Sequence, residues 1–261
     1  MTTEAAIDPR AVVHPGARIG TDVSIGPFCV IGDGVEIGDG CRLEAHVVVH
    51  GPTVLGPDNR ISPMASLGGP PQDLKYRGEP TRLVIGARNT IREFCTFNRG
   101  TPGGGGISTI GDDNLFMAYV HLAHDVHVGS RTIFANAATL AGHVEVGDEA
   151  TVGAFSGVHQ FARVAKHAFI GGYSVVSQDA LPWVRTVGNR ATTHGINLVG
   201  MQRKGYSPET IAAVKRCYMT LFRSGLLLRE ALAKVEAELG GVPEVAYFLE
   251  FVRTSKRGVC R

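Results

Sequence analysis

A bulky apolar side chain recurs at every sixth position along most of the first 176 residues. One series runs in register from Ile7 to Leu67, the same phase resumes over residues 85–97, and a shifted series covers residues 110–176. A period of six fits neither an α-helix nor a simply alternating strand, whereas a coil of short strands that turns at fixed offsets produces it. The pattern therefore predicts a solenoid built mainly of short β-strands.

The fourth position after each apolar residue is small, β-branched or Asn, as at Ala11 and Val23. A side chain at this offset is expected to point into a crowded interior. Cys29, Cys41 and Cys95 all occupy it, so we interpret these cysteines as buried packing residues without a redox or metal role.

Two segments interrupt the repeat, at about residues 68–84 and 100–109, and the second contains four consecutive glycines. Segments that break a repeat and are rich in glycine or proline usually leave the solenoid as surface loops. We therefore expect both to project from the coil.

Helical signals follow the repeat. Ser207, Pro208 and Glu209 are typical of an N-cap, a first-turn proline and an acid favoured by the helix dipole. Apolar residues recur at helical spacing beyond them. The sequence therefore predicts a solenoid over residues 1–187 and a helical C-terminal domain over residues 188–261.

Composition narrows the class of protein. Hydrophobic residues make up 44% of the chain, and the 26 Lys and Arg nearly balance the 24 Asp and Glu, so nucleic-acid binding is not expected. Five cysteines without a CxxC pair argue against a disulfide framework and a zinc ribbon. With no signal-peptide pattern and no apolar run long enough for a bilayer, we expect a cytoplasmic protein without stable membrane insertion.

Three histidines are spaced close to the repeat. His143 follows His124 by 19 residues, and His159 follows His143 by 16. If three hexads close one turn of about 18 residues, the three side chains should stack near one edge of the solenoid.

His124 directly precedes Asp125. A carboxylate beside an imidazole orients the ring and keeps it basic enough to take a proton from an alcohol, so the pair is a candidate general base. Two alternatives use the same pattern. The stacked histidines could hold zinc, as in carbonic-anhydrase-like hexapeptide proteins, or the solenoid could serve assembly alone.

The hexads resemble those of the hexapeptide-repeat transferases, which fold as a left-handed parallel β-helix. Other motifs resemble the family of UDP-N-acetylglucosamine O-acyltransferases over essentially the whole chain. These motifs are Gln72–Thr81, Ile91–Glu93, Asn98–Thr101, Ala123–Asp125, Leu140–His143, Val158–Phe161 and Gly188–Asn189. The resemblance implies a mainly β fold, a left-handed parallel β-helix with a C-terminal α-helical domain.

The same resemblance implies transfer of a fatty acyl group, 3-hydroxylated in some members, from an acyl carrier protein thioester to the 3-hydroxyl of UDP-N-acetylglucosamine, the first step of lipid A biosynthesis. His124 would act as general base, Asp125 would orient it, and the N–H of Gly142 would stabilise the oxyanion. Because the donor arrives activated as a thioester, neither a metal nor an organic cofactor is implied.

Substrate-binding residues are also implied by the resemblance. Those assigned to the amino sugar, its diphosphate and the surrounding cleft are Gln72, Asp73, Lys75, His121, His143, His159 and Gln160. Asn197, Arg203 and Lys204 would hold the nucleotide, from a neighbouring subunit of a homotrimer. Gly172 would line the floor of the acyl groove, with Arg190 near its end.

One alternative within the family is disfavoured and two questions stay open. The N-acyltransferase of the same pathway carries an extra N-terminal domain, for which hexads that begin at Ile7 leave no room. A variant that acylates a 3-amino sugar is compatible with the sequence. Lys215, Arg216, Arg253, Lys256 and Arg257 either dock the acidic carrier or form an ordinary solvated face.

Overall fold

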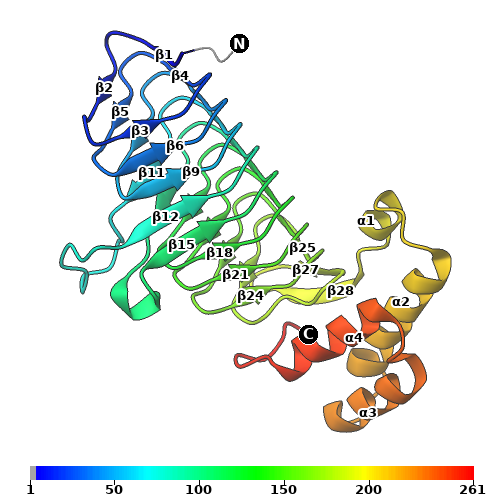
Figure 1. The fold of residues 1–261 in the computed structure, drawn as a ribbon. Helices are drawn as coiled ribbons and strands as arrows, with labels where there is room; N and C mark the ends of the chain where they lie inside the picture. Colours follow the sequence, from blue (N-terminus) through cyan, green and yellow to red (C-terminus); the bar gives the residue numbers. More distant parts are fainter. Residues whose placement is uncertain (1–3) are drawn as a thin grey trace.

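The computed structural model describes residues 4–261, which form a triangular coil of parallel strands followed by helices (Figure 1). Sheet A contains β1 (Ala6–Ile7), β4 (Ser24–Ile25), β7 (Arg42–Leu43), β10 (Arg60–Ile61), β13 (Thr90–Ile91), β16 (Leu115–Phe116), β19 (Ile133–Phe134), β22 (Thr151–Val152), β25 (Phe169–Ile170), β27 (Val184–Val187) and β28 (Thr192–Ile196). Sheet B contains β2 (Val12–Val13), β5 (Val30–Ile31), β8 (Val48–Val49), β11 (Ser66–Gly69), β14 (Thr96–Asn98), β17 (His121–Leu122), β20 (Thr139–Leu140), β23 (Gly157–Val158) and β26 (Val175–Val176). Sheet C contains β3 (Arg18–Ile19), β6 (Val35–Ile37), β9 (Thr53–Leu55), β12 (Arg82–Ile85), β15 (Ile107–Ile110), β18 (His127–Val128), β21 (Glu145–Val146) and β24 (Arg163–Val164).

The six-residue pattern explains the core. From β4 onward the second residue of each two-residue strand is buried, as Ile25 and Phe134 are at 2% and 0% exposure. Burying an aliphatic or aromatic side chain of this size contributes about 1.5–3 kcal/mol, and the coil repeats the gain at successive strands. Cys29, Cys41 and Cys95 are fully buried, which confirms their predicted place in the interior.

The three edges of the coil differ in chemistry, and nearly every turn places a residue with positive φ at each. The aromatic edge joins sheet A to sheet B and exposes Phe28, Met64, Phe94, Tyr119, Phe155 and Tyr173. The charged edge joins sheet C to sheet A and includes Arg88, Asp113, Arg131 and Glu149. The histidine edge joins sheet B to sheet C and includes His14, His50, His124, His143 and His159.

Both loops leave the coil at the histidine edge, where they project side by side (Figure 1). The first spans residues 70–81 and the second residues 99–106, with a short 3₁₀ turn, η1 (Pro102–Gly104). Each is shorter than the interruption of the repeat, because β12 and β15 pair over four residues and absorb the ends of the irregular segments.

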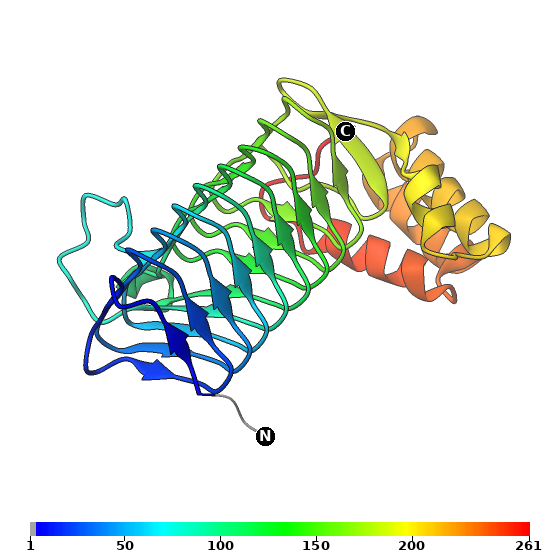
Figure 2. The ribbon, with the colours of Figure 1, turned by 90° about the horizontal axis from the view of Figure 1, so that it is seen from above.

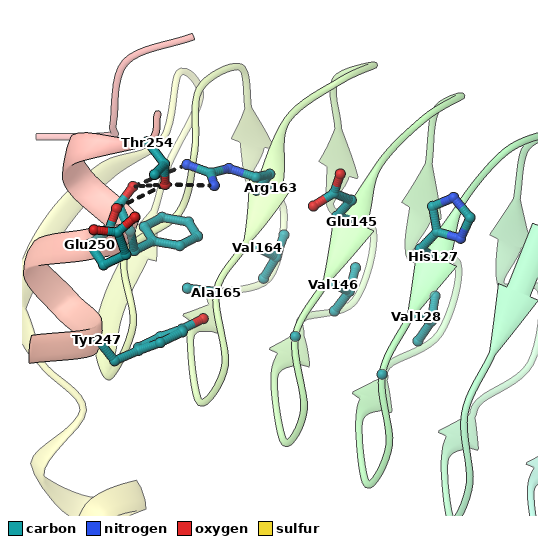
Figure 3. Close-up of a pocket in the computed structure, with 13 residues that line it drawn as sticks. His127, Val128, Glu145, Val146, Arg163, Val164, Ala165, Tyr247, Glu250 and Thr254 are labelled. Atoms are coloured by element: carbon teal, nitrogen blue, oxygen red, sulfur yellow. Dashed lines mark hydrogen bonds between the residues drawn. The ribbon is translucent and has the colours of Figure 1, made fainter. Parts of the chain in front are cut away.

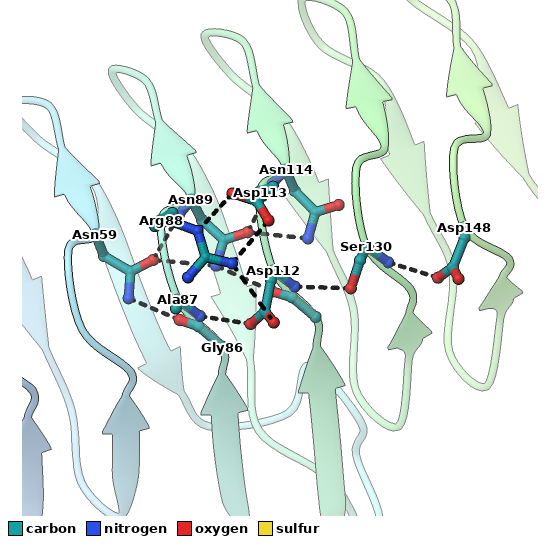
Figure 4. Close-up of polar contacts among 11 residues, drawn as sticks. Asn59, Gly86, Ala87, Arg88, Asn89, Asp112, Asp113, Asn114, Ser130 and Asp148 are labelled. Carbon is teal, nitrogen blue, oxygen red and sulfur yellow. Dashed lines mark hydrogen bonds and ion pairs between the residues drawn. The ribbon is translucent and has the colours of Figure 1, made fainter. Parts of the chain in front are cut away.

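A ladder of buried polar side chains supports the charged edge (Figure 4). Asn59 Oδ1 accepts from the N–H and Nδ2 of Asn89, and Asn89 Oδ1 accepts in the same way from Asn114. Thr132 ends the ladder by donating its N–H and hydroxyl to Asn114 Oδ1. Buried backbone N–H groups that a corner leaves unpaired are thereby satisfied.

The C-terminal part closes one end of the coil (Figure 2). β27 and β28 pair antiparallel within sheet A, so residues 192–196 continue the coil rather than the helical region. The helices are α1 (Leu198–Arg203), α2 (Pro208–Arg223), α3 (Leu228–Leu239) and α4 (Pro243–Arg253). Ser207 caps α2 by accepting a hydrogen bond from the Thr210 N–H, as its sequence predicted. None of the helices within residues 4–261 has the length and apolar character to span a membrane.

Candidate active site

His124 and Asp125 lie at the histidine edge between β17 and β18. His124 Nδ1 is 2.8 Å from Asp125 Oδ2, and because a carboxylate can only accept, Nδ1–H is the donor and Nε2 carries the free lone pair. The side chain of Asp125 is 1% exposed and that of His124 is 18% exposed. The buried acid therefore holds an imidazole whose basic nitrogen remains accessible.

Asp125 is held by the second loop as well. The N–H of Thr101 donates to Asp125 Oδ1 over 2.7 Å, and the Thr101 hydroxyl donates to Oδ2 over 2.6 Å. Ser108 Oγ accepts from the N–H of Asp125 at 2.9 Å. Neither Thr101 nor Ser108 was assigned a role from the sequence, since both lie far from Asp125 along the chain.

Gly142 and His143 occupy the equivalent corner on the next turn, between β20 and β21. A β-carbon on Gly142 would lie 2.6 Å from His124 Cε1 and 2.8 Å from Nε2, so the glycine allows the imidazole to approach the backbone. The His143 ring packs edge-on against His124, with centroids 5.1 Å apart. Burial lowers the pKa of His143, which favours the neutral imidazole, although the charge of Asp125 opposes the shift.

The third histidine does not continue the stack. Phe161, at 4.4 Å, supplies the ring that stacks on His143. His159 and Gln160 are exposed on the same turn, and His159 Nδ1 lies 3.3 Å from an Arg257 Nη. The expected stack therefore consists of His124, His143 and Phe161, with His159 at its margin.

The first loop brings further candidates to the same edge. Gln72 and Lys75 are exposed, and Asp73 lies near enough for its charge to act on the pKa of His143. His121 Nδ1 is 2.8 Å from Thr96 Oγ1, and burial lowers the pKa of His121. The loop thus presents a carboxylate, a lysine and an amide at the edge that carries His143.

Asn197 and Arg203 lie elsewhere. They line a groove of about 1160 Å³ over the outer face of sheet A, together with Val199. Asn197 also caps α1 by accepting from the Gly200 N–H. Lys204 pairs with Glu149 at 2.7 Å and lines an adjoining cavity of about 80 Å³, which Asn197 also lines.

Gly172 and Arg190 share the aromatic edge. Gly172 lies in the corner between β25 and β26, and Arg190 lies between β27 and β28 on the following turn. Their placement on consecutive turns agrees with a common surface, although it is not the edge that carries His124.

Known proteins resemble the chain over nearly its whole length. A family model described as UDP N-acetylglucosamine O-acyltransferase, domain 2, matches residues 179–260. Curated acyl-[acyl-carrier-protein]–UDP-N-acetylglucosamine O-acyltransferases from Thiobacillus denitrificans and Burkholderia orbicola are 52% and 49% identical, over 98% of this chain and 100% and 99% of theirs. The solved structure of LpxA from Acinetobacter baumannii is 44% identical, with a TM-score of 0.95 over 98% of this chain and 99% of that one.

The chain belongs to the UDP-N-acetylglucosamine O-acyltransferase family.

The fold of this family confirms the predicted left-handed parallel β-helix with a helical C-terminal domain. A second solved relative, LpxA from Bacteroides fragilis, is 38% identical with a TM-score of 0.95, over 97% of this chain and 99% of that one. The parallel pairing of each strand with the strand one turn later accounts for the agreement at modest identity.

A metal site in this O-acyltransferase fits the geometry less well than an acid–base pair. Within residues 4–261, ligand atoms of His124, Asp125 and His143 lie within 4.8 Å of one another. The Asp125 carboxylate already accepts two hydrogen bonds from Thr101 and one from His124. A carboxylate so engaged has little capacity left for a cation, and His159 lies outside the group.

Two grooves of this O-acyltransferase lie between the coil and the C-terminal residues, and one of them reaches Asp125. One, of about 530 Å³, is lined by Asp125, His143, Lys256 and Arg257 among others. The other, of about 490 Å³, runs under α4, where His127, Glu145 and Arg163 project from successive turns of sheet C (Figure 3). Lys256 and Arg257, near the C-terminus, therefore border the space beside Asp125 and His143.

Proposed function

We propose that this chain transfers a fatty acyl group from the thioester of an acyl carrier protein to the 3-hydroxyl of UDP-N-acetylglucosamine, the first step of lipid A biosynthesis. The names of its relatives support this reaction. The observation that carries the mechanism is the His124–Asp125 pair, whose free Nε2 faces the buried corner at Gly142.

In this mechanism His124 Nε2 removes the proton of the sugar 3-hydroxyl as its oxygen attacks the thioester carbonyl carbon. A C–O bond forms, the C–S bond breaks, and the imidazolium returns its proton to the departing thiolate. Asp125 stabilises the imidazolium through Nδ1–H. Gly142 is buried, and its N–H makes no hydrogen bond within residues 4–261, which suits it to donate to the oxyanion.

The sugar would lie along the histidine edge. Asp73 and Lys75 from the first loop, with His121 and Gln72, offer hydrogen bonds to hydroxyls and charge for the diphosphate. His143, His159 and Gln160 would line the same cleft. The neutral form of His143 suits a hydrogen-bonding role better than a second positive charge.

The nucleotide would be held by another subunit. In a three-sided coil the histidine edge lies opposite sheet A, over which Asn197 and Arg203 line their groove. A single chain presents these two groups of residues on different faces, whereas neighbouring chains of a closed trimer can bring them to one substrate molecule. The aromatic edge supports such an assembly, because Phe94 and Tyr119, and Phe155 and Tyr173, form stacked pairs that remain exposed in the single chain.

The acyl carrier protein would bind near the C-terminal residues of the chain. Lys256 and Arg257 border the groove that reaches Asp125 and His143, whereas Arg216 and Arg253 are paired with Glu238 and Glu236. We assign carrier docking to the two tail residues on this basis. A cytoplasmic location is supported by five cysteines that are all free and buried, as expected in a reducing compartment.

Replacement of His124 tests the proposal. His124→Ala should lower kcat by about 10²-fold or more with UDP-N-acetylglucosamine and an acyl carrier thioester, since a positioned base is lost. His14→Ala is the matched control, because His14 lies on the same edge near the N-terminal end of the coil. Near-normal turnover of a folded His124→Ala protein would reject the mechanism. Parallel assays with the 3-amino analogue distinguish ester from amide formation.

A further inference from the structure

The second loop contacts the His124–Asp125 pair through Thr101. Its N–H and its hydroxyl donate to different oxygens of the Asp125 carboxylate, over 2.7 and 2.6 Å. Thr101 is 7% exposed and Asp125 is 1% exposed, so both bonds are shielded from water. Hydrogen bonds to a buried charged group are among the stronger ones in a protein.

Gly104 closes the loop over the carboxylate. A β-carbon at this position would overlap the Asp125 carboxyl group, whereas one on the neighbouring Gly103 would meet nothing within 4 Å. The 3₁₀ turn η1, Pro102–Gly104, therefore packs directly on the acid. This contact covers one side of the Asp125 carboxyl group.

The same segment anchors the first loop. Asn98 Nδ2 donates to the Pro70 carbonyl, and Arg99 Nε donates to the Tyr76 hydroxyl at 3.2 Å. Arg99 Nη1 also donates to the Gly51 carbonyl, which belongs to the coil, over 2.9 Å. Residues 98–101 thus tie the first loop to the coil and to Asp125.

We propose that Thr101 is a positioning residue of the transfer reaction, which fixes the orientation and hydrogen bonding of Asp125 and, through it, of His124. This inference rests on the function proposed above. Asp125 Oδ2 accepts from both the Thr101 hydroxyl and His124 Nδ1–H, so the two donors share one oxygen. A carboxylate that accepts the threonine hydroxyl is a weaker base toward the imidazolium than one that does not.

Loss of the hydroxyl should therefore have two effects. The carboxylate gains freedom to rotate, which misplaces the imidazole and lowers kcat. In the conformers that keep the bond to His124 Nδ1–H, a carboxylate with one donor fewer attracts the imidazolium more strongly, so the acid limb of the pH profile of kcat/KM moves to higher pH. The charged and titratable groups around His124 are Asp125 and His143, while Asp73 from the first loop and His127 from β18 act on His143.

Four substitutions test the inference. Thr101→Val removes the hydroxyl at nearly constant volume and should lower kcat about tenfold or more, with KM for UDP-N-acetylglucosamine unchanged. Thr101→Ser retains the hydroxyl and should restore kcat to within about twofold and the acid limb to its original pH. Gly104→Ala should lower kcat as Thr101→Val does, whereas Gly103→Ala should not.

The outcomes separate the inference from the proposed function. If His124→Ala is inactive but Thr101→Val keeps both its kcat and its acid limb, Thr101 has no positioning role. A loss of kcat in Thr101→Val that Thr101→Ser fails to repair, or an acid limb that stays in place, also overturns it. If His124→Ala remains active, the general-base mechanism itself fails. Thermal unfolding midpoints of each variant separate these effects from loss of fold.

Discussion

Gly142 marks the closest approach of the neighbouring turn to the ring of His124. A β-carbon there would lie 2.6 Å from Cε1, well inside van der Waals contact. Gly142→Ala should therefore push the imidazole from its bond with Asp125 and lower kcat by about 10²-fold, as loss of a positioned base does. Steady-state kinetics of Gly142→Ala against Gly241→Ala tests this, because a β-carbon on Gly241 meets nothing within 4 Å. Equal turnover of the two variants would contradict it.

A side chain would meet less steric hindrance at Gly172 than at its neighbour Gly171. A β-carbon there would meet the Ala154 carbonyl oxygen at 3.3 Å, whereas one on Gly171 would meet the Val187 side chain at 2.7 Å. The coil thus demands glycine more strongly at Gly171 than at Gly172, which leaves room for a role in the acyl groove.

Gly172→Met should shift the preference toward shorter acyl chains. Methionine would project from the floor of the proposed acyl groove, and each methylene admitted to an apolar groove contributes about 0.8 kcal/mol, nearly fourfold in affinity. The measurement is kcat/KM over a series of acyl carrier thioesters. An equal loss at every chain length would assign Gly172 to the backbone corner and leave Arg190 as the next candidate.

At the residue scale, the sequence predicts contacts between chain neighbours and between residues about one turn of the repeat apart. His124 and Asp125 are neighbours in the chain, and His143 follows about one turn later, so their meeting could be predicted. Thr101 could not be paired with Asp125, because their contact depends on how the second loop folds back. The pairing of Lys204 with Glu149 likewise depends on how α1 sits on the coil.

The asparagine ladder links successive turns at the charged edge (Figure 4). The Asn89 side chain both accepts and donates within the ladder, so Asn89→Ala would leave the N–H and the Nδ2 group of Asn114 without their acceptor in a buried site. The backbone N–H of residue 89 would still donate to Asn59 Oδ1. The free energy of unfolding should fall by about 3 kcal/mol, since each unpaired buried polar group costs about 1–3 kcal/mol. Urea unfolding at fixed protein concentration measures this change.

Arg88→Ala is the control for the ladder. Arg88 is next to Asn89 but exposed, and it pairs with Asp113 at the surface. Exposed pairs contribute about 0–1 kcal/mol, so this variant should unfold close to the original protein. A similar effect of both substitutions would show that the ladder adds little beyond surface charge.

At the element scale, a strict period determines where strands lie until the chain leaves the coil. The hexads locate the two-residue strands because each inward residue must fill the same narrow core. They do not fix the ends of β12 and β15, which lengthen where the loops enter sheet C. Nor do they identify β28, whose antiparallel pairing with β27 has no counterpart in the repeat.

At the scale of the whole molecule, the residues proposed to contact one substrate lie on three different surfaces of the chain. His124 lies on the histidine edge, Arg203 lines the groove over the opposite sheet A, and Gly172 lies on the aromatic edge. Lys75, on the first loop, leaves the coil at the same edge as His124. A site that uses all four residues therefore takes His124 and Lys75 from one chain and Arg203 and Gly172 from a neighbour.

Subunit mixing tests this arrangement. His124→Ala and Arg203→Ala chains, each inactive alone, should regain activity when exchanged into common trimers, because an interface between an intact histidine edge and an intact nucleotide groove can form. With random assembly of equal amounts, about one quarter of the interfaces should be intact. Mixing His124→Ala with Lys75→Ala is the control and should recover nothing, since both changes damage the same edge. If exchange is proven by tagged subunits and only this control pair recovers activity, the division of residues between chains is wrong. An active monomer would exclude the shared site altogether.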